Sequence, residues 1–395
     1  MAYTDLSAPA MPPPPGETSN FTNPPNGNAT GLGALLLMLI ISTIFICIRM
    51  YANAFITKKF WVEDVLVLLG YLTFVLTVWT AFMFVQYPGF FVHTWNVTVG
   101  DEIAALYYVF LFGVFYSIAL AFVKMSIPLE WCRIFVPPGT WSTSYFWWGA
   151  MAVVALQAMF LPVIVVLLNV QCLPHAAIWD IRLLPDATCI PLPTLQKLSA
   201  SVHLVTDVAI LVLPQKIIFD LQLSLRKKAG LAVVFGLGAL GVVCSVFRLI
   251  DTIMLANEPD VFFYTGPVEL WCTAEVTCGL FVACAPTLPR VIKDTPLLRR
   301  VFRASTRRGA TSSDGPTAIR TTGGKRGGGT DTLGTKLDYT KMDEENEFHM
   351  INITKSDSTE VLREAAKPGI TRTTDITVHH SASPDHNDPR PWSHV

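Results

Sequence analysis

Long runs of apolar residues, separated by short polar stretches, occupy residues 30 to 290 of the chain. A helix needs about 20 such residues to cross the hydrocarbon core of a bilayer. Backbone groups in lipid must be paired within their own segment, so each run is expected to be helical. The pattern predicts an all-α, polytopic membrane protein with a seven-helix transmembrane bundle formed by residues 31–51, 62–83, 103–131, 147–170, 195–213, 229–250 and 268–288.

Charged residues are scarce and unevenly placed. They make up 15% of the chain, against about 25% in soluble domains, and most lie outside the apolar runs. Residues 1–30 form a polar segment before the transmembrane domain 31–290, and a basic juxtamembrane segment, 291–308, follows it. That segment either lies along the inner leaflet or acts only as a stop-transfer cluster. Residues 309–395 hold few large apolar side chains and are predicted to be a disordered cytosolic tail.

The basic residues of the loops predict the orientation. Lysine and arginine accumulate on the cytosolic side of membrane proteins. Here they gather after the first, third, fifth and seventh helices, while the N-terminal segment and the loops after helices two and six have none. The N-terminus is therefore predicted outside and the C-terminus in the cytosol. Arg49 is counted in this argument with the neighbouring loop residues Lys58 and Lys59.

Three glycosylation acceptors support the same orientation. The Asn-X-Thr pattern begins at Asn20, Asn28 and Asn96 on the predicted outer side. A fourth match, at Asn352, lies in the predicted cytosolic tail and is expected to stay unmodified. Asn28 lies close to the start of the first helix.

Two of the eight cysteines differ from the rest. Cys172 and Cys189 both fall in the predicted outer loop after the fourth helix, whereas the other six lie in or beside helices. The outer compartment is oxidising, so a disulfide between them is expected, worth about 3 kcal/mol in the chain-entropy account. The alternative is a pair of free loop thiols.

Four of the ionisable residues within the predicted helices stand out as candidates for interior charge pairs. Such groups are costly at membrane depth and usually face the bundle and find partners. Lys124 and Asp207 lie at similar depth in the cytosolic half, and Arg248 and Glu275 lie in the outer half, so we predict two charge pairs. The alternatives are that Lys124 extends to the cytosolic interface and that Arg248 pairs locally with Asp251.

Several kinds of chemistry find no support in the sequence. The last predicted helix has no lysine for a retinal Schiff base, and the histidines have no metal-ligand spacing. No phosphate-binding glycine loop or nucleophile with a paired base is evident. We therefore expect no enzymatic activity, no cofactor and no nucleic-acid partner. Seven helices without an internal repeat also argue against a transporter.

A set of short strings in a fixed order resembles one protein family. They are Arg49-Met50-Tyr51, Glu63-Asp64, Lys124-Met125-Ser126, Gln171-Cys172-Leu173-Pro174, Thr206-Asp207, Ser245-Val246-Phe247-Arg248 and Cys284-Ala285-Pro286-Thr287-Leu288. The chain thus resembles the fungal rhodopsin-like integral membrane proteins, which include a membrane protein of the satratoxin biosynthetic cluster and receptor-like proteins of fungal pathogenicity. Some members carry an eight-cysteine module before the first helix; residues 1–30 contain no cysteine. His203, Pro128 and Glu130 depart from the family pattern, so we expect different packing at the cytosolic end.

The resemblance implies seven helices, no retinal and a receptor-like role. The leading hypothesis is a protein of the plasma membrane or an endomembrane, embedded in membrane lipid. It senses an unknown outer small molecule and signals to a G protein or another cytosolic partner. The alternative is a membrane component of a secondary-metabolite cluster that handles, transports or tolerates its product.

Overall fold

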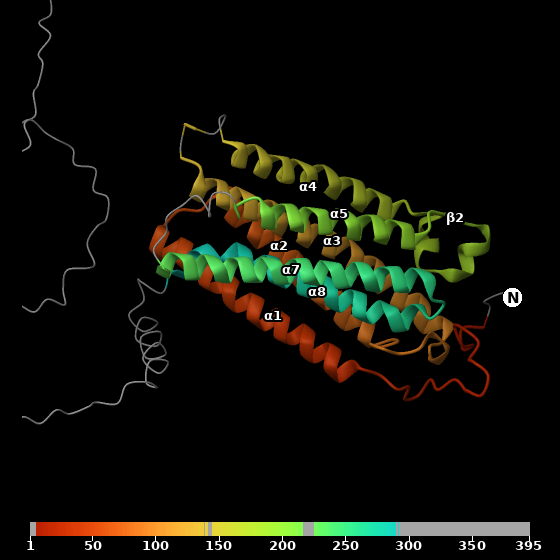
Figure 1. Ribbon diagram of the computed structural model, residues 1–395. Coiled ribbons are helices and arrows are strands. Elements are labelled where there is room, and N and C mark those ends of the chain that lie inside the picture. The colour runs from red at the N-terminus through yellow and green to blue at the C-terminus, as the bar shows by residue number, and fades with distance from the viewer. Residues whose placement is uncertain (1–4, 138, 141–143, 216–224, 290, 292–395) are drawn as a thin grey trace, which may run out of the picture. The chain divides into compact units, whose positions relative to one another are not determined.

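The computed structural model describes residues 5–137, 139–140, 144–215, 225–289 and 291. Of the predicted juxtamembrane segment 291–308 only residue 291 is described, and the predicted tail 309–395 lies outside these residues. Within the described part, seven helices are long and apolar enough to cross a membrane. Figure 1 shows them as one bundle with roughly parallel axes. They are α1 (Asn28–Tyr51), α2 (Val62–Val85), α3 (Val99–Phe135), α4 (Tyr145–Asn169), α5 (Leu192–Val212), α7 (Leu225–Asn257) and α8 (Val261–Cys284).

Several helices extend beyond the predicted apolar runs because polar residues cap or continue them. The Thr98 hydroxyl accepts the Asp101 backbone N–H at 3.1 Å, so α3 begins at Val99 rather than at residue 103. The Asp64 carboxylate accepts the Trp61 N–H at 3.0 Å at the start of α2. A π-helical turn, Ala52–Thr57, continues α1, and a 3-10 turn, Ala285–Thr287, follows α8.

Helix α8 begins seven residues before the predicted start at 268 (268 − 261 = 7). The predicted start at residue 268 comes directly after Pro267. In the structure Pro267 lies inside the helix, and two further turns precede it. The residues that follow Pro267 consequently lie deeper in the bundle than the sequence indicated.

Helix α3 lies between α2 and α8 at close range. Val123 is fully buried, and its methyl groups would lie 2.9 Å and 2.7 Å from a Cβ added at Gly70 of α2 and at Gly279 of α8. Small residues let membrane helices approach closely in this way. Because Val123 is held against Gly279, this close approach sets the position of the next residue, Lys124, along the axis of α8.

The two faces of the helices differ as a lipid environment requires. The buried core includes Phe74, Leu120, Val276 and Leu280. Large apolar side chains are exposed on the outer faces, among them Leu37 and Ile44 of α1 and Met159 and Val163 of α4. Hydrocarbon solvates such faces. The protein is therefore a multi-pass membrane protein; its orientation stays a prediction.

One end of the bundle carries the loop between α4 and α5 and the beginning of α1 (Figure 1). We call it the disulfide end, because this loop holds the strands β1 (Cys172–Leu173) and β2 (Thr188–Cys189), which pair antiparallel. The N-terminal segment lies at the same end, where the Ala10 N–H donates to the Val97 carbonyl at 2.9 Å. The other end, where α1 ends and α2 begins, is called the Arg49 end.

Candidate ligand pocket and buried charge networks

The four interior charges of the sequence analysis meet in the middle of the bundle. Lys124 Nζ lies 3.0 Å from Asp207 Oδ2, and Arg248 Nε lies 2.9 Å from Glu275 Oε2. Lys124 Nζ also lies 2.9 Å from Glu275 Oε1. Both predicted pairs are present, and the contact between Lys124 and Glu275 joins them into one network, which was not predicted. We call Lys124, Asp207, Arg248 and Glu275 the central network.

The alternatives for the two cations do not hold in this structure. The Lys124 residue is 2% exposed, and its ammonium also donates to the His203 carbonyl at 3.0 Å rather than extending to the interface. Arg248 is 3% exposed and bonds to Glu275 instead of Asp251.

The central network is balanced in charge and tied to polar neighbours. It contains two cations and two carboxylates. The Tyr116 hydroxyl donates to Glu275 Oε2 at 2.8 Å, the Ser245 hydroxyl donates to Asp207, and the Arg248 guanidinium lies 5.5 Å from the centre of the Tyr116 ring. Removing one member of a buried pair leaves an uncompensated charge, which costs far more than the pair contributes.

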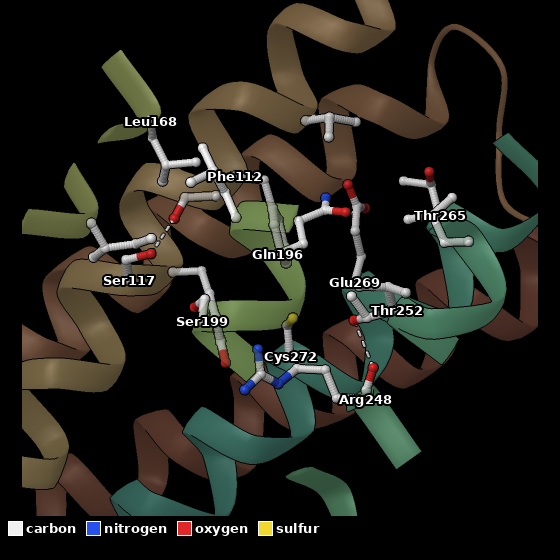
Figure 2. A pocket seen from close by; sticks show the side chains of 17 residues that line it. Phe112, Ser117, Leu168, Gln196, Ser199, Arg248, Thr252, Thr265, Glu269 and Cys272 are labelled. Atoms are coloured by element: carbon white, nitrogen blue, oxygen red, sulfur yellow. Dashed lines mark hydrogen bonds between the residues drawn. The ribbon is translucent and has the colours of Figure 1, made fainter. Parts of the chain in front are cut away.

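A cavity of about 80 Å³ adjoins the central network on its disulfide side. Five helices line it, and most of the lining is apolar (Figure 2). Its residues include Phe112 and Tyr116 of α3, Leu168 of α4, Ser199 of α5, Arg248 and Thr252 of α7, and Glu269 and Cys272 of α8. An apolar cavity with a few polar groups is the usual form of a small-molecule site.

Arg248 belongs to both features. Its side chain lines the cavity, while its Nε pairs with Glu275. A molecule in the cavity would therefore contact a residue that is bonded into the central network. No other member of the network lines this cavity.

A second buried charge cluster lies at the Arg49 end. Arg49 is fully buried; its Nη2 lies 2.5 Å from Asp64 Oδ1 and its Nη1 lies 2.8 Å from Glu130 Oε2. It also donates to the Ala283 carbonyl. Arg49, Asp64 and Glu130, here called the Arg49 cluster, thus tie α1, α2 and α3 together and reach α8.

The Arg49 cluster corrects two expectations. Arg49 was counted with the loop residues Lys58 and Lys59 in the orientation argument, and Glu130 was regarded as a departure from the family pattern that changes the packing at the cytosolic end. The structure buries both and pairs them. The sequence contained evidence for this pairing. Arg49 lies inside the predicted first helix, and the acids of helices two and three occur at the same predicted depth.

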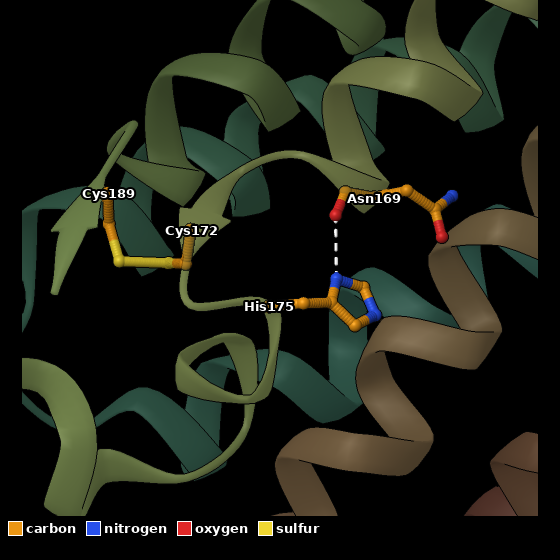
Figure 3. The surroundings of a disulfide bond; sticks show 4 residues. All are labelled: Asn169, Cys172, His175 and Cys189. Carbon is orange, nitrogen blue, oxygen red and sulfur yellow. Dashed lines mark hydrogen bonds between the residues drawn. A yellow bond between two sulfur atoms is a disulfide. The ribbon is translucent and has the colours of Figure 1, made fainter.

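The predicted outer loop contains a disulfide between Cys172 and Cys189, which joins β1 to β2 (Figure 3). Cys172 is 3% exposed, so the bridge anchors the loop to the bundle. His175 Nδ1 lies 2.7 Å from the Asn169 carbonyl oxygen at the end of α4. Farther along the loop, the side-chain hydrogen bond from Arg182 lowers the pKa of Asp180.

The three Asn-X-Thr acceptors have different surroundings. Asn20 is exposed in the N-terminal segment. Asn96 is 9% exposed, and its Oδ1 accepts the Asn20 backbone N–H at 3.0 Å. Asn28 is half-buried, and its Oδ1 accepts the Phe90 N–H at 2.7 Å. A glycan is bulky and needs a surface position. The structure therefore favours Asn20 over the other two.

We expect Asn20 to carry the principal glycan. In a fungal expression host, Asn20→Gln should abolish most of the mobility shift produced by endoglycosidase treatment, whereas Asn28→Gln and Asn96→Gln should leave it in place. A shift that is lost with Asn96→Gln and kept with Asn20→Gln would contradict the folded surroundings described above.

Comparison with known proteins gives the family. The model of the fungal rhodopsin domain matches residues 48–294, which include the end of α1 from residue 48 onward and the other six transmembrane helices. The chain belongs to the fungal rhodopsin domain family. This confirms the resemblance drawn from the short strings, and the Arg49 cluster, the central network, the pocket and the disulfide all fall within the matched residues.

Curated relatives fall into two groups by name. The chain is 40% identical over 380 residues, 96% of its own length and 94% of the relative's, to "Fugralins biosynthesis cluster protein 2" of Gibberella zeae. It is 34% identical to a "SAT4 family membrane protein" of Emericella nidulans over 30% of this chain and 29% of that one. It is 25% identical to "Receptor GIN3" of Arthrobotrys oligospora over 51% of this chain and 46% of the receptor. No solved structure matches the chain.

Proposed function

We propose that this member of the fungal rhodopsin domain family is a receptor-like protein that binds a small molecule in the cavity at its disulfide end. The observation that carries the proposal is the double role of Arg248, which lines the cavity and pairs with Glu275. Occupancy of the cavity can thus change a contact inside the bundle. The named receptor among the relatives supports the same role. The proposal includes no catalysed reaction.

The central network supplies a route from the cavity toward the other helices. A ligand that draws Arg248 toward itself weakens the bond from Arg248 to Glu275. Glu275 then pairs more strongly with Lys124 of α3. The ion pair between Lys124 and Asp207 of α5 becomes weaker as a result. A ligand shifts a bundle between two packings only by its difference in affinity for them, commonly about 1–3 kcal/mol.

The proposed output is a cytosolic signalling partner, such as a Gα subunit, at the Arg49 end. This assignment uses the predicted orientation, in which that end faces the cytosol. We expect that partner at the loop between α3 and α4 and at the loop between α5 and α7; residues 216–224 of the latter lie outside the described residues. The proposed location is the plasma membrane or an endomembrane.

A second candidate is a membrane component of a secondary-metabolite cluster, which binds, moves or tolerates the product. It is favoured by the similarity to a biosynthesis cluster protein along nearly the whole of both chains. The same cavity would serve this role, since most of its lining is apolar. The two candidate functions predict different effects of filling the cavity, one on signalling and the other on the metabolites of the cell.

The test compares a deletion strain complemented with the native chain or with Ser199→Phe. This substitution places a ring in the cavity from α5 while the central network keeps its charges. For a receptor, the strain with the filled cavity should lose ligand-dependent proximity between the protein and Gα while the extracted metabolites stay unchanged. Loss or retention of one class of metabolite with normal Gα proximity would instead support the cluster role.

A further inference from the structure

Glu269 is a buried acid that none of the arguments above uses. It lies on α8, is 2% exposed and lines the cavity. Neither of its carboxylate oxygens has a hydrogen-bond partner among the described residues. Figure 2 shows its side chain reaching into the pocket, with the Gln196 side chain nearby in this view and the Arg248 guanidinium below.

An isolated buried carboxylate is expensive, so such groups are normally paired. Arg248 is the other charged residue that lines the cavity, and Glu275 already neutralises it. The central network as a whole contains two cations and two carboxylates, so it has no surplus positive charge for Glu269. Glu269 therefore either carries a proton while the cavity is empty or takes a cation from outside the network.

We propose that Glu269 binds the protonated nitrogen of an amine ligand in this cavity. This inference rests on the proposed ligand-binding function and names the class of ligand. The ammonium would donate to the Glu269 carboxylate, with the hydroxyl groups of Thr265 and Thr252 on the same wall. The apolar part of the ligand would pack on Phe112 and Leu168.

The size of the cavity limits the enclosed part of the ligand. At about 80 Å³ it is smaller than the apolar cavity of about 150 Å³ that accommodates benzene in an engineered protein. It thus suits a short alkylamine or the amino head of a larger molecule. A charge-assisted hydrogen bond contributes about 1.5–3 kcal/mol, equivalent to a change of about tenfold to a hundredfold in affinity.

The experiment uses the purified full-length protein in lipid nanodiscs. The probe is butylamine, and 1-butanol and sodium chloride are titrated separately at matched ionic strength. Affinity is obtained from the increase in Tm with ligand concentration. The test variant is Glu269→Gln, which keeps the shape and removes the charge. The matched control is Glu258→Gln, the same change at an exposed position of the disulfide end.

Butylamine should stabilise the native chain and Glu258→Gln more than butanol does, and Glu269→Gln should weaken its binding about tenfold to a hundredfold. Equal effects of butylamine and butanol, equal binding by Glu269→Gln, or no binding would each overturn the assignment. A sodium effect as large as that of butylamine and lost in Glu269→Gln would overturn it in favour of an inorganic cation.

Two further outcomes also distinguish the amine assignment from the proposed function. If Glu269→Gln does not fold, the comparison of butylamine with butanol on the native chain still decides the matter. If both probes bind equally and Ser199→Phe abolishes both, the cavity binds small molecules and the proposed function stands while the amine assignment fails.

Discussion

Glu275→Gln is expected to destabilise the protein by about 3–5 kcal/mol, because it removes the acid shared by two buried cations. The Glu275 carboxylate faces Lys124 and Arg248 at 2.9 Å each and accepts the Tyr116 hydroxyl at 2.8 Å. The amide keeps the shape but leaves the two buried cations with Asp207 as their one remaining acid. The measurement is the Tm of the purified protein in nanodiscs, together with the amount that reaches the membrane.

Glu258→Gln is the control for this prediction, because Glu258 is exposed and the chemical change is identical. It should leave the Tm within about 1 °C of the native value, since surface substitutions usually change stability by less than about 0.5 kcal/mol. A Tm of Glu275→Gln equal to that of Glu258→Gln would contradict the central network.

Glu275 pairs with both Lys124 and Arg248, and this changes how a second mutation could restore the stability lost in a single mutant. Simple pairs would be restored by reversing both charges. Here Arg248→Glu combined with Glu275→Arg would place a second cation beside Lys124, so no rescue is expected. Neutralising Lys124 and Asp207 together, with Lys124→Met and Asp207→Asn, leaves Arg248 and Glu275 as a balanced pair and should be less harmful than Lys124→Met alone.

Hydropathy was sufficient to predict the seven helices, because lipid requires each span to satisfy its own backbone. The pairing of the interior charges was harder. The position of a residue along its helix gives its depth in the membrane. Similar depth was the reason for pairing Lys124 with Asp207 and Arg248 with Glu275. Depth does not say which side chains share a partner, because this depends on rotation and on the close approach at Gly279. The bond between Lys124 and Glu275 could not be predicted for this reason.

Glu269 shows how one misplaced helix start hides a site. With the last helix predicted to begin at 268, Glu269 lay in its first turn, where a carboxylate meets water and helix N–H groups. The structure begins α8 at Val261, so Glu269 lies two turns inside and is buried. Pro267 lies inside α8, because proline is tolerated inside membrane helices when neighbours compensate for the lost hydrogen bond.

Arg49 was missed for the opposite reason, because its charge was assigned to the loop beyond it. Arg49→Met is expected to destabilise the protein by about 3–5 kcal/mol, since it leaves Asp64 and Glu130 buried together without a cation. Arg49→Lys should lie between the native chain and Arg49→Met. Lysine keeps the charge, but its three donors sit on one nitrogen, whereas the guanidinium spreads four hydrogen bonds to Asp64, Glu130 and the Ala283 carbonyl over three nitrogens.

The matched control is Lys58→Met, which removes an exposed cation from the same end of the bundle and should leave the Tm nearly unchanged. Glu130→Gln in the background of Arg49→Met removes one of the stranded acids. The pair should therefore cost less than the sum of the two single changes, by about 0.5–3 kcal/mol. Strict additivity, or equal losses for Arg49→Met and Lys58→Met, would mean that Arg49 acts as the free loop charge of the sequence prediction. Coupling would instead establish the Arg49 cluster as the contact that holds α1, α2 and α3 together where the proposed signalling partner docks.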